Sequence, residues 1–382
     1  MMEVIYVLPT LYLCGIALFL LTVTLGSWFY RPYGGSGKQH RFLVVIPAHN
    51  EVAHIEACLE SVTRSRYPRQ FFKTAVIADN CSDTTAVIAA ARGALVFQRM
   101  DEQKRGKGYA LDWFFRQKRQ VFEGFDAVCV VDADSQLDPC FLDEMNKALS
   151  REDSTVIQAF NGVANTDENW RTALTTCALN VFNHLRMVGS QQCFGSAILK
   201  GNGMCFRASW LLEHGWPAHS LIEDLELSFL LADQGIPVHY QSSARITSEM
   251  PVSRAQANVQ RERWENGRLS MMPFLGKALR KGHFHLAMDL VTPPLSLYVL
   301  LVFFWGVMTL LFFPGFSLLV AALLMVLFAY VGSAQFQQRL SLKLWFYFAM
   351  LPLFIGWKAA LYIKWLFCKK AVQWRRTPRF NE

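Results

Sequence analysis

Long apolar blocks at both ends of the chain flank a middle region in which short apolar runs alternate with amphipathic stretches. The first block, residues 4–30, is long enough to cross a bilayer, which takes about 20 residues of helix. It lacks the basic start and the shorter apolar core of a cleaved signal peptide, so we expect a retained transmembrane helix. The basic residues that follow, Arg31, Lys38 and Arg41, predict that the middle region is cytoplasmic.

Three further apolar segments lie in the C-terminal part of the chain: residues 295–313, 316–334 and 342–367. If all three crossed the bilayer, the basic tail after them would lie outside the cell, whereas positive charge favours the cytoplasmic side. One of the three is therefore expected to be re-entrant or interfacial. The candidate is the stretch from Trp357 to Phe367 in the third segment, because Lys358 and Lys364 suit a membrane surface better than a bilayer centre.

Short apolar runs in the middle region predict strands that alternate with helices. Strands are expected at residues 41–47, 74–78, 94–98, 127–131 and 156–160, and a glycine-punctuated stretch, 201–207, leads into another. This alternation predicts a mostly parallel sheet with helices on both faces. Ligands of such sheets bind beyond the carboxyl ends of the strands, where Pro47, Asp79 and Asp132 fall.

Two carboxylates one residue apart, Asp132 and Asp134, follow the apolar run of residues 127–131. Negative charge crowded at a strand end is costly unless a cation or an array of hydrogen-bond donors lies beside it. A hard divalent cation, Mg²⁺ or Mn²⁺, prefers carboxylate oxygens and brings phosphates with it. The alternative is an ordinary strand-end turn in which an aspartate caps the backbone.

Other polar residues fall where they can complete a site for a phosphorylated ligand. Asp79 can accept hydrogen bonds from a base or ribose, and Glu51 can hold a ribose hydroxyl, although either can also cap local backbone. Lys107, between two glycines, can meet phosphate oxygens or lie in a solvated basic loop. Glu223 and Asp224 open a predicted helix, where acids also complement the helix dipole.

A later cluster combines Gln260 and Arg263, which are three residues apart on one helical face, with Trp264 beside them. Arginine can grip a pyrophosphate with two parallel hydrogen bonds. A tryptophan ring can stack on a sugar. Taken alone, the same pattern is also typical of an amphipathic helix on a membrane surface.

In order, these motifs resemble those of family 2 glycosyltransferases, most of all the membrane-embedded branch that includes cellulose, chitin and hyaluronan synthases. The resemblance covers residues 40 to 275 and rests on residues 46–51, 79–83, 132–134, 223–224 and 260–264. Residues 374–379 are also similar to a tail of such proteins. The resemblance implies a GT-A catalytic domain and transfer that inverts the anomeric centre.

The resemblance also implies roles for the donor-binding positions. Asp79 would bind the uracil of a UDP-sugar, next to the strand end at Pro47, and Glu51 would lie near the ribose. Gln260 and Arg263 would hold the diphosphate, to which Lys107 is a further candidate.

For the reaction itself, the resemblance implies that Asp132 and Asp134 form a metal motif for Mg²⁺ or Mn²⁺, with Asp134 the more direct ligand. Asp224 would be the general base that deprotonates the acceptor hydroxyl, and Trp264 would line the acceptor site. No covalent nucleophile is needed for a single inverting displacement.

The expected reaction is therefore sugar transfer from a nucleotide-sugar donor to a growing polysaccharide or oligosaccharide at the membrane, with partner subunits for export as a further possibility. The alternative is a single addition to a lipid acceptor, since three C-terminal segments make a small channel for a polymer. An inactive scaffold of the same fold is a third hypothesis, against which the intact set of five motifs argues.

Composition agrees with a membrane enzyme that does not bind nucleic acid. Hydrophobic residues make up 52% of the chain, more than is usual in a soluble protein. The net charge is +8, and the basic residues lie mostly beside the apolar segments, which indicates attraction to anionic lipid. The nine cysteines show no paired metal-ligand spacing and are expected to be reduced packing residues.

The expected organisation places a multi-pass protein in the plasma (bacterial inner) membrane with a cytoplasmic catalytic domain. Its parts are a transmembrane helix (1–30), a linker (31–40), the catalytic domain (41–248), an amphipathic interfacial segment carrying the Q-x-x-R-W motif (249–288), transmembrane or re-entrant helices (289–368) and a basic cytoplasmic tail (369–382).

Overall fold

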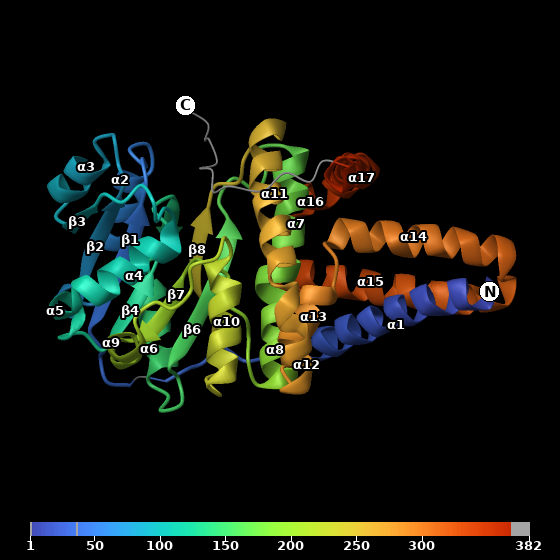
Figure 1. Ribbon diagram of the computed structural model, residues 1–382, viewed down its shortest axis with the longest axis horizontal. Helices are drawn as coiled ribbons and strands as arrows, with labels where there is room; N and C mark the ends of the chain where they lie inside the picture. Colours follow the sequence, from blue (N-terminus) through green and yellow to red (C-terminus); the bar gives the residue numbers. More distant parts are fainter. Residues whose placement is uncertain (1, 36, 368–382) are drawn as a thin grey trace.

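The computed structural model describes residues 2–35 and 37–367, and its centre is an eight-stranded sheet with the order β3-β2-β1-β4-β7-β6-β8-β5 (Figure 1). The strands are β1 (Phe42–Ala48), β2 (Phe72–Asp79), β3 (Leu95–Arg99), β4 (Ala127–Val130), β5 (Ser135–Leu137), β6 (Val156–Val163), β7 (Met204–Arg207) and β8 (Val238–Ser248). The first four pair in parallel, as do β6 and β8. Strand β7 runs antiparallel to both β4 and β6, and β5 antiparallel to β8, so the sheet is mixed with a parallel majority.

Helices cover both faces of this sheet, as the alternating pattern predicts. One face carries α2 (Ile55–Thr63), α3 (Thr85–Ala91) and α6 (Phe141–Leu149). The other carries α4 (Lys107–Gln117), α5 (Arg119–Phe122), α9 (Ala208–His214) and α10 (Glu223–Asp233). Successive residues of β1 enter opposite cores, with Leu43 and Val45 in one and Phe42, Val44 and Ile46 in the other. This double burial explains why the strand reads as a continuous apolar run.

Two rows of helices stand between the sheet and the membrane helices (Figure 1). One row is α7 (Trp170–Asn180), a π-helical turn η2 (Val181–Leu185) and α8 (Arg186–Phe194). The other is α11 (Arg254–Ser270), η3 (Met272–Phe274), α12 (Leu275–Arg280) and α13 (Phe284–Val291). Arg186 of α8 connects the two rows with each other and with the membrane helices. Its guanidinium donates to Asp289 of α13 at 3.1 Å and to the hydroxyl of Tyr330, in a membrane helix, at 3.1 Å.

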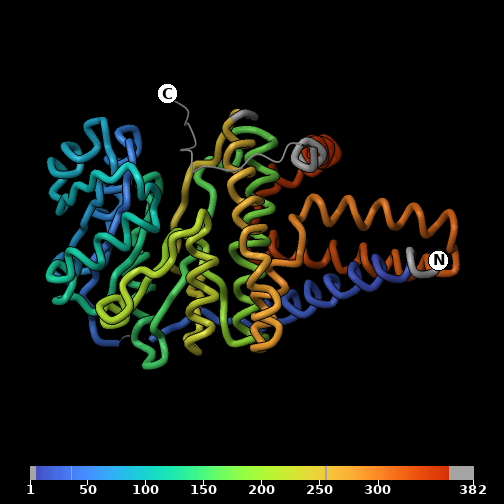
Figure 2. The backbone as a smooth tube through the Cα atoms, viewed as in Figure 1, coloured from blue at the N-terminus to red at the C-terminus, as the bar shows by residue number. Residues whose placement is uncertain are grey.

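In the part of the chain that the structure describes, three helices are long and apolar enough to cross a membrane, and they project together from the domain (Figures 1 and 2). They are α1 (Met2–Ser27), α14 (Leu295–Phe312) and α15 (Ser317–Gln337), the last two joined by η4 (Pro314–Phe316). Side chains from all three fill the space between them, among them Leu20, Tyr298 and Leu323. The three helices therefore form one packed bundle.

The last apolar segment takes a different direction. It divides into α16 (Leu342–Phe346), η5 (Tyr347–Met350) and α17 (Leu351–Phe367). Figure 1 shows α17 end-on, whereas α1, α14 and α15 run across the view, so α17 lies crosswise to the bundle. Its Phe354 and Trp357 pack against Leu174 and Ala257. This is the arrangement expected of a helix on a membrane surface. The predicted basic tail, residues 369–382, lies outside the described residues.

Candidate active site

A cleft of about 330 Å³ opens at the carboxyl ends of β1, β2 and β4. It brings together every residue that the sequence proposed for the site, namely Pro47, Glu51, Asp79, Lys107, Asp132, Asp134, Asp224, Gln260, Arg263 and Trp264. The parallel pairing of β1 with β2 and β4 accounts for the first strand ends, since their carboxyl ends meet at one edge. Helices α10 and α11 supply the remaining side of the cleft.

Asp79 lies buried at one end of the cleft, in an ion pair that the sequence did not reveal. Its Oδ1 accepts a hydrogen bond from Arg99 Nη1 at 2.5 Å and another from the Asn80 side chain at 3.1 Å. Arg99 stands opposite Asp79 on the neighbouring strand β3. Burial raises the pKa of Asp79, while the Arg99 hydrogen bond and charge act against that rise. The pair fixes the carboxylate expected to meet the base of the donor.

Replacing Arg99 with methionine is expected to destabilise the fold by about 3–5 kcal/mol, because it leaves the buried Asp79 carboxylate without its cation. The matched control is Arg92→Met, which breaks an exposed pair with Glu56 and should cost no more than about 1 kcal/mol. Thermal unfolding of the purified variants measures both effects. Equal losses in the two variants would contradict a structural role for the buried pair.

Lys107 reaches across the cleft to the metal motif. Its Nζ donates to Asp132 Oδ1 at 2.5 Å and to the Gly201 carbonyl, and lies 3.7 Å from Glu223 Oε1. Burial alone would lower the pKa of Lys107, but the charges of Asp132 and Glu223 outweigh it and raise the pKa. Lys107 is therefore a charged ammonium that neutralises Asp132.

An asparagine that sequence reasoning missed holds the metal motif in place. Asn202 Oδ1 accepts the Asp132 backbone N–H at 3.0 Å, and Asn202 Nδ2 donates to Ser135 Oγ at 2.8 Å. The same Ser135 hydroxyl donates to Asp134 Oδ1 at 3.0 Å. Asn202 is flanked by two glycines with φ of 75° and 67°, a conformation that favours glycine and was the available signal.

The motif fits a metal that a diphosphate completes. Within residues 2–35 and 37–367, no group of three or more His, Cys, Asp or Glu side chains could hold a metal ion by itself. Mg²⁺ is often bound through only one or two carboxylates, with substrate phosphates and water as its other ligands. Asp134, held by Ser135 at the cleft, is a suitable carboxylate of this kind.

The first turn of α10 places two acids in different surroundings. Glu223 faces Lys107, and burial, together with the Asp224 and Asp132 charges, raises its pKa to about 7 against the effect of Lys107. Burial also raises the pKa of Asp224, opposed by the charge of Lys200. Asp224 packs closely against Gly201. A Cβ atom added to this glycine would lie 3.2 Å from Asp224 Oδ2. A carboxylate whose pKa is raised in a cleft is a candidate for proton abstraction.

Two faces of helix α11 contact different parts of the protein. Gln260, Arg263 and Trp264 line the cleft. Arg261 instead donates to Thr175 Oγ1 at 3.1 Å and lies over the Trp357 ring, 4.4 Å from its centroid. The helix thus links the cleft to the crosswise helix α17.

Comparison with known proteins agrees with this geometry. Residues 40–267, well over half of the chain, match the family described as glycosyltransferase like family 2. The chain is 24% identical over 270 residues to beta-monoglucosyldiacylglycerol synthase of Trichormus variabilis, covering 68% of this chain and 56% of that protein. It is 25% identical over 268 residues to hyaluronan synthase of Streptococcus pyogenes, covering 64% of this chain and 61% of that protein. The chain thus spans about three fifths of the length of these relatives.

A solved structure shares the fold. The mannosyltransferase PcManGT from Pyrobaculum calidifontis, in complex with GDP-Man and Mn²⁺, superposes with a TM-score of 0.53 at 17% identity, covering 94% of this chain and 100% of that one. The family match and the shared fold confirm the resemblance read from the motifs and the expected GT-A domain. The chain belongs to the family 2 glycosyltransferases and has a GT-A fold.

Proposed function

We propose that this glycosyltransferase moves a sugar from a nucleotide-sugar donor, expected to be a UDP-sugar, to an acceptor hydroxyl at the cytoplasmic face of the membrane, with inversion of the anomeric centre. The observation that carries the proposal is the single cleft in which Asp79, Asp134, Asp224 and Arg263 meet. A growing polysaccharide and a lipid present the same hydroxyl to Asp224, so the transfer chemistry is common to both acceptors.

The donor would lie along the cleft from β2 to α11. Its base would meet Asp79, held by Arg99, and its ribose would lie near Glu51. Lys107, Gln260 and Arg263 would hold the diphosphate. PcManGT, which shares the fold, carries GDP-Man and Mn²⁺ in its structure, and this analogy supports a nucleotide-sugar and a divalent metal as the ligands.

Asp224 would accept the proton of the acceptor hydroxyl while that oxygen bonds to the anomeric carbon of the donor. The bond from this carbon to the diphosphate breaks in the same displacement, so the configuration inverts. Mg²⁺ or Mn²⁺ held by Asp134 would neutralise the charge that develops on the leaving diphosphate. Lys107, which neutralises Asp132 in this structure, supplies a second positive charge beside it.

The membrane arrangement supports a cytoplasmic catalytic domain. One N-terminal span and two C-terminal spans leave the domain and α17 on the same side of the bilayer. Arg31, Lys38 and Arg41 flank the first span on the domain side, which favours the cytoplasm. We therefore propose a multi-pass protein of the plasma (bacterial inner) membrane. Partner subunits for export would be needed only for a secreted polymer.

A donor panel tests the proposal. The full chain in lipid nanodiscs would receive UDP-glucose, UDP-galactose, UDP-N-acetylglucosamine, UDP-glucuronic acid or GDP-mannose, with Mn²⁺ and either membrane lipid extract or short oligosaccharides. We expect one donor to release its nucleoside diphosphate in proportion to glycosylated acceptor, without any partner protein. Binding of UDP without turnover of any donor would contradict the proposal and favour an inactive scaffold.

Arg263→Ala is expected to weaken UDP binding in the presence of Mn²⁺ by roughly ten- to a hundredfold. Hydrogen bonds to charged groups contribute about 1.5–3 kcal/mol, and each 1.4 kcal/mol changes the dissociation constant about tenfold. The control is Arg261→Ala on the same helix, whose guanidinium contacts Thr175 and Trp357 and not the cleft. Isothermal titration with UDP measures both, and equal weakening would exclude a specific contact of Arg263 with the diphosphate.

A further inference from the structure

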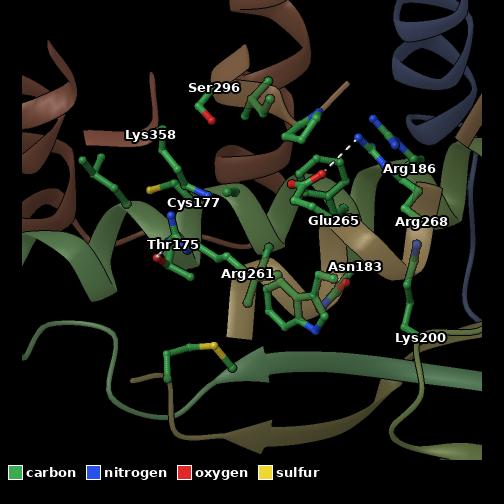
Figure 3. Close-up of a pocket in the computed structure, with 18 of the residues that line it drawn as sticks. Thr175, Cys177, Asn183, Arg186, Lys200, Arg261, Glu265, Arg268, Ser296 and Lys358 are labelled. Carbon is green, nitrogen blue, oxygen red and sulfur yellow. Dashed lines mark hydrogen bonds and ion pairs between the residues drawn. The ribbon is translucent and has the colours of Figure 1, made fainter. Parts of the chain in front are cut away.

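A second cavity, of about 370 Å³, lies between the catalytic domain and the membrane helices (Figure 3). We call it the interface cavity, and its walls come from β6, α7, η2, α8, α10, α11, α13, α14, α15, η5 and α17. It shares six lining residues with the catalytic cleft: Asn161, Lys200, Ile222, Asp224, Met250 and Trp264. The two spaces therefore meet at the proposed base, Asp224.

The walls of the interface cavity are mainly hydrocarbon. Leu174 and Phe182 line it from the domain side, Val299 and Val331 from the candidate membrane spans, and Leu351 and Phe354 from the α17 side. A hydrocarbon chain gains about 0.8 kcal/mol for each methylene buried against such walls. A polysaccharide would instead leave its hydroxyls without hydrogen-bond partners here, which is costly.

One group of charged side chains lies on the side of the cavity that adjoins the catalytic cleft, whereas Arg261 and Lys358 lie toward α17. Figure 3 shows Arg186, Lys200, Arg268 and Glu265 together there, with a dashed ion pair from Arg186. Arg186 donates to Asp289 at 3.1 Å, and Lys200 Nζ lies 3.9 Å from the same carboxylate. Lys200 lines both spaces. The cavity is thus polar where it meets Asp224 and mainly apolar where α14 and α15 line it.

The membrane bundle supplies an independent argument about the acceptor. Buried side chains of α1, α14 and α15, including Leu20, Tyr298 and Leu323, pack into one cluster between the helices. Tyr298 and Leu20 are 1% and 0% exposed, so these positions are filled by protein. A secreted polymer needs a lined passage through the bilayer, and the centre of this bundle is occupied by its own side chains.

We propose that the acceptor is a hydroxyl-bearing membrane lipid whose apolar chain occupies the interface cavity and whose hydroxyl reaches Asp224. The proposal rests on the transfer function above and names its acceptor class. The lipid oxygen bonds to the anomeric carbon, its proton passes to Asp224, and the carbon–oxygen bond to UDP breaks, with the electron pair leaving on UDP. Each turnover adds one sugar to one lipid headgroup at the membrane surface.

Photolabelling tests where the lipid binds. The probe is a diacylglycerol with a diazirine in one acyl chain, added to the full chain in nanodiscs and mapped by mass spectrometry after irradiation. We expect labels within residues 174–182 and 348–358, and competition by dioleoylglycerol. Ala178→Trp fills the cavity and should reduce this labelling at least tenfold, while Mn²⁺-dependent UDP binding is unchanged, because Ala178 does not line the adjoining catalytic cleft.

The matched control is Ala321→Trp, the same substitution at an exposed position of α15, which should leave labelling intact. Ala178→Leu gives a graded loss if the tryptophan variant folds poorly. Labels confined to other surfaces of α14 and α15, with no effect of either Ala178 variant, would overturn the proposal.

Product analysis separates this inference from the proposed function. A lipid that gains one sugar mass and moves to the organic phase supports it. UDP release with a water-soluble ladder of chains would overturn the lipid acceptor and leave the transferase function standing. Absence of nucleoside diphosphate release from every donor would overturn both.

Discussion

Replacing Asp224 with asparagine is expected to lower the rate of sugar transfer by about 10²- to 10⁴-fold, the range that a positioned general base contributes. The amide has nearly the same shape but cannot accept the proton of the acceptor hydroxyl. Donor binding should be unchanged, because the variant keeps the proposed contacts of Asp79 with the nucleobase and of Arg263 with the diphosphate. Single-turnover transfer and UDP titration measure the two quantities separately.

The pH dependence gives a second readout of the same residue. Burial raises the pKa of Asp224 above the ordinary aspartate value of 3.8, opposed by the charges of Lys200 and Lys107. Because the base must be ionised, kcat/KM should fall as the pH drops through this raised pKa. The acid limb of the wild-type profile should therefore lie above 3.8, and it should be absent from the residual activity of Asp224→Asn.

Two other acids of α10 serve as comparisons. Glu223→Gln removes the neighbouring acid that pairs with Lys107, and it should reduce transfer less than Asp224→Asn does. Asp233 lies at the opposite end of the helix, where it pairs with Lys277 and Lys281. Because it is far from the cleft end of the helix, Asp233→Asn should transfer sugar at close to the wild-type rate. If Glu223→Gln abolished transfer and Asp224→Asn retained it, the base would be Glu223.

Removal of divalent metal is the second large effect. Chelation with EDTA is expected to reduce turnover roughly a thousandfold, since a metal supplies several kcal/mol of charge stabilisation and each 1.4 kcal/mol is about tenfold in rate. Added Mn²⁺ or Mg²⁺ should restore it. Asp134→Asn should raise the Mn²⁺ concentration needed more than Asp132→Asn, because Asp132 is paired with Lys107.

Electron paramagnetic resonance of Mn²⁺ checks this assignment without turnover. In the wild type, UDP should strengthen Mn²⁺ binding, because the diphosphate completes a site that the described side chains do not close by themselves. Asp134→Asn should lose this UDP-dependent binding. Turnover that is indifferent to EDTA would contradict the metal assignment.

The parallel half of the fold was predictable because its strands are buried on both faces. Residues 42–46 and 127–131 read as continuous apolar runs, and the helices between them force parallel pairing. Strand β8 was missed because its sequence, from Val238 to Ser248, is largely polar, although Gln241 and His239 are buried within the sheet. Strand β5 has three residues, too few for a periodic signal.

The site residues were predictable because strand ends of a parallel sheet share an edge, but their partners were not. Arg99 lies 20 residues from Asp79, Lys107 lies 25 from Asp132, and Asn202 lies 70 from the backbone that it holds. Such pairs depend on strand order, which no local pattern contains. The interface cavity has the same origin, since elements far apart in the sequence, from β6 to α17, form its walls.

The stereochemistry of the product tests the central claim most directly. With the active donor of the panel, whose sugar is α-linked to UDP, proton NMR of the purified product reports the anomeric configuration. One displacement assisted by Asp224 predicts a β-linked sugar in the wild type, and the same β-linked product formed far more slowly by Asp224→Asn. An α-linked product would contradict the account, because retention requires a second displacement or another mechanism.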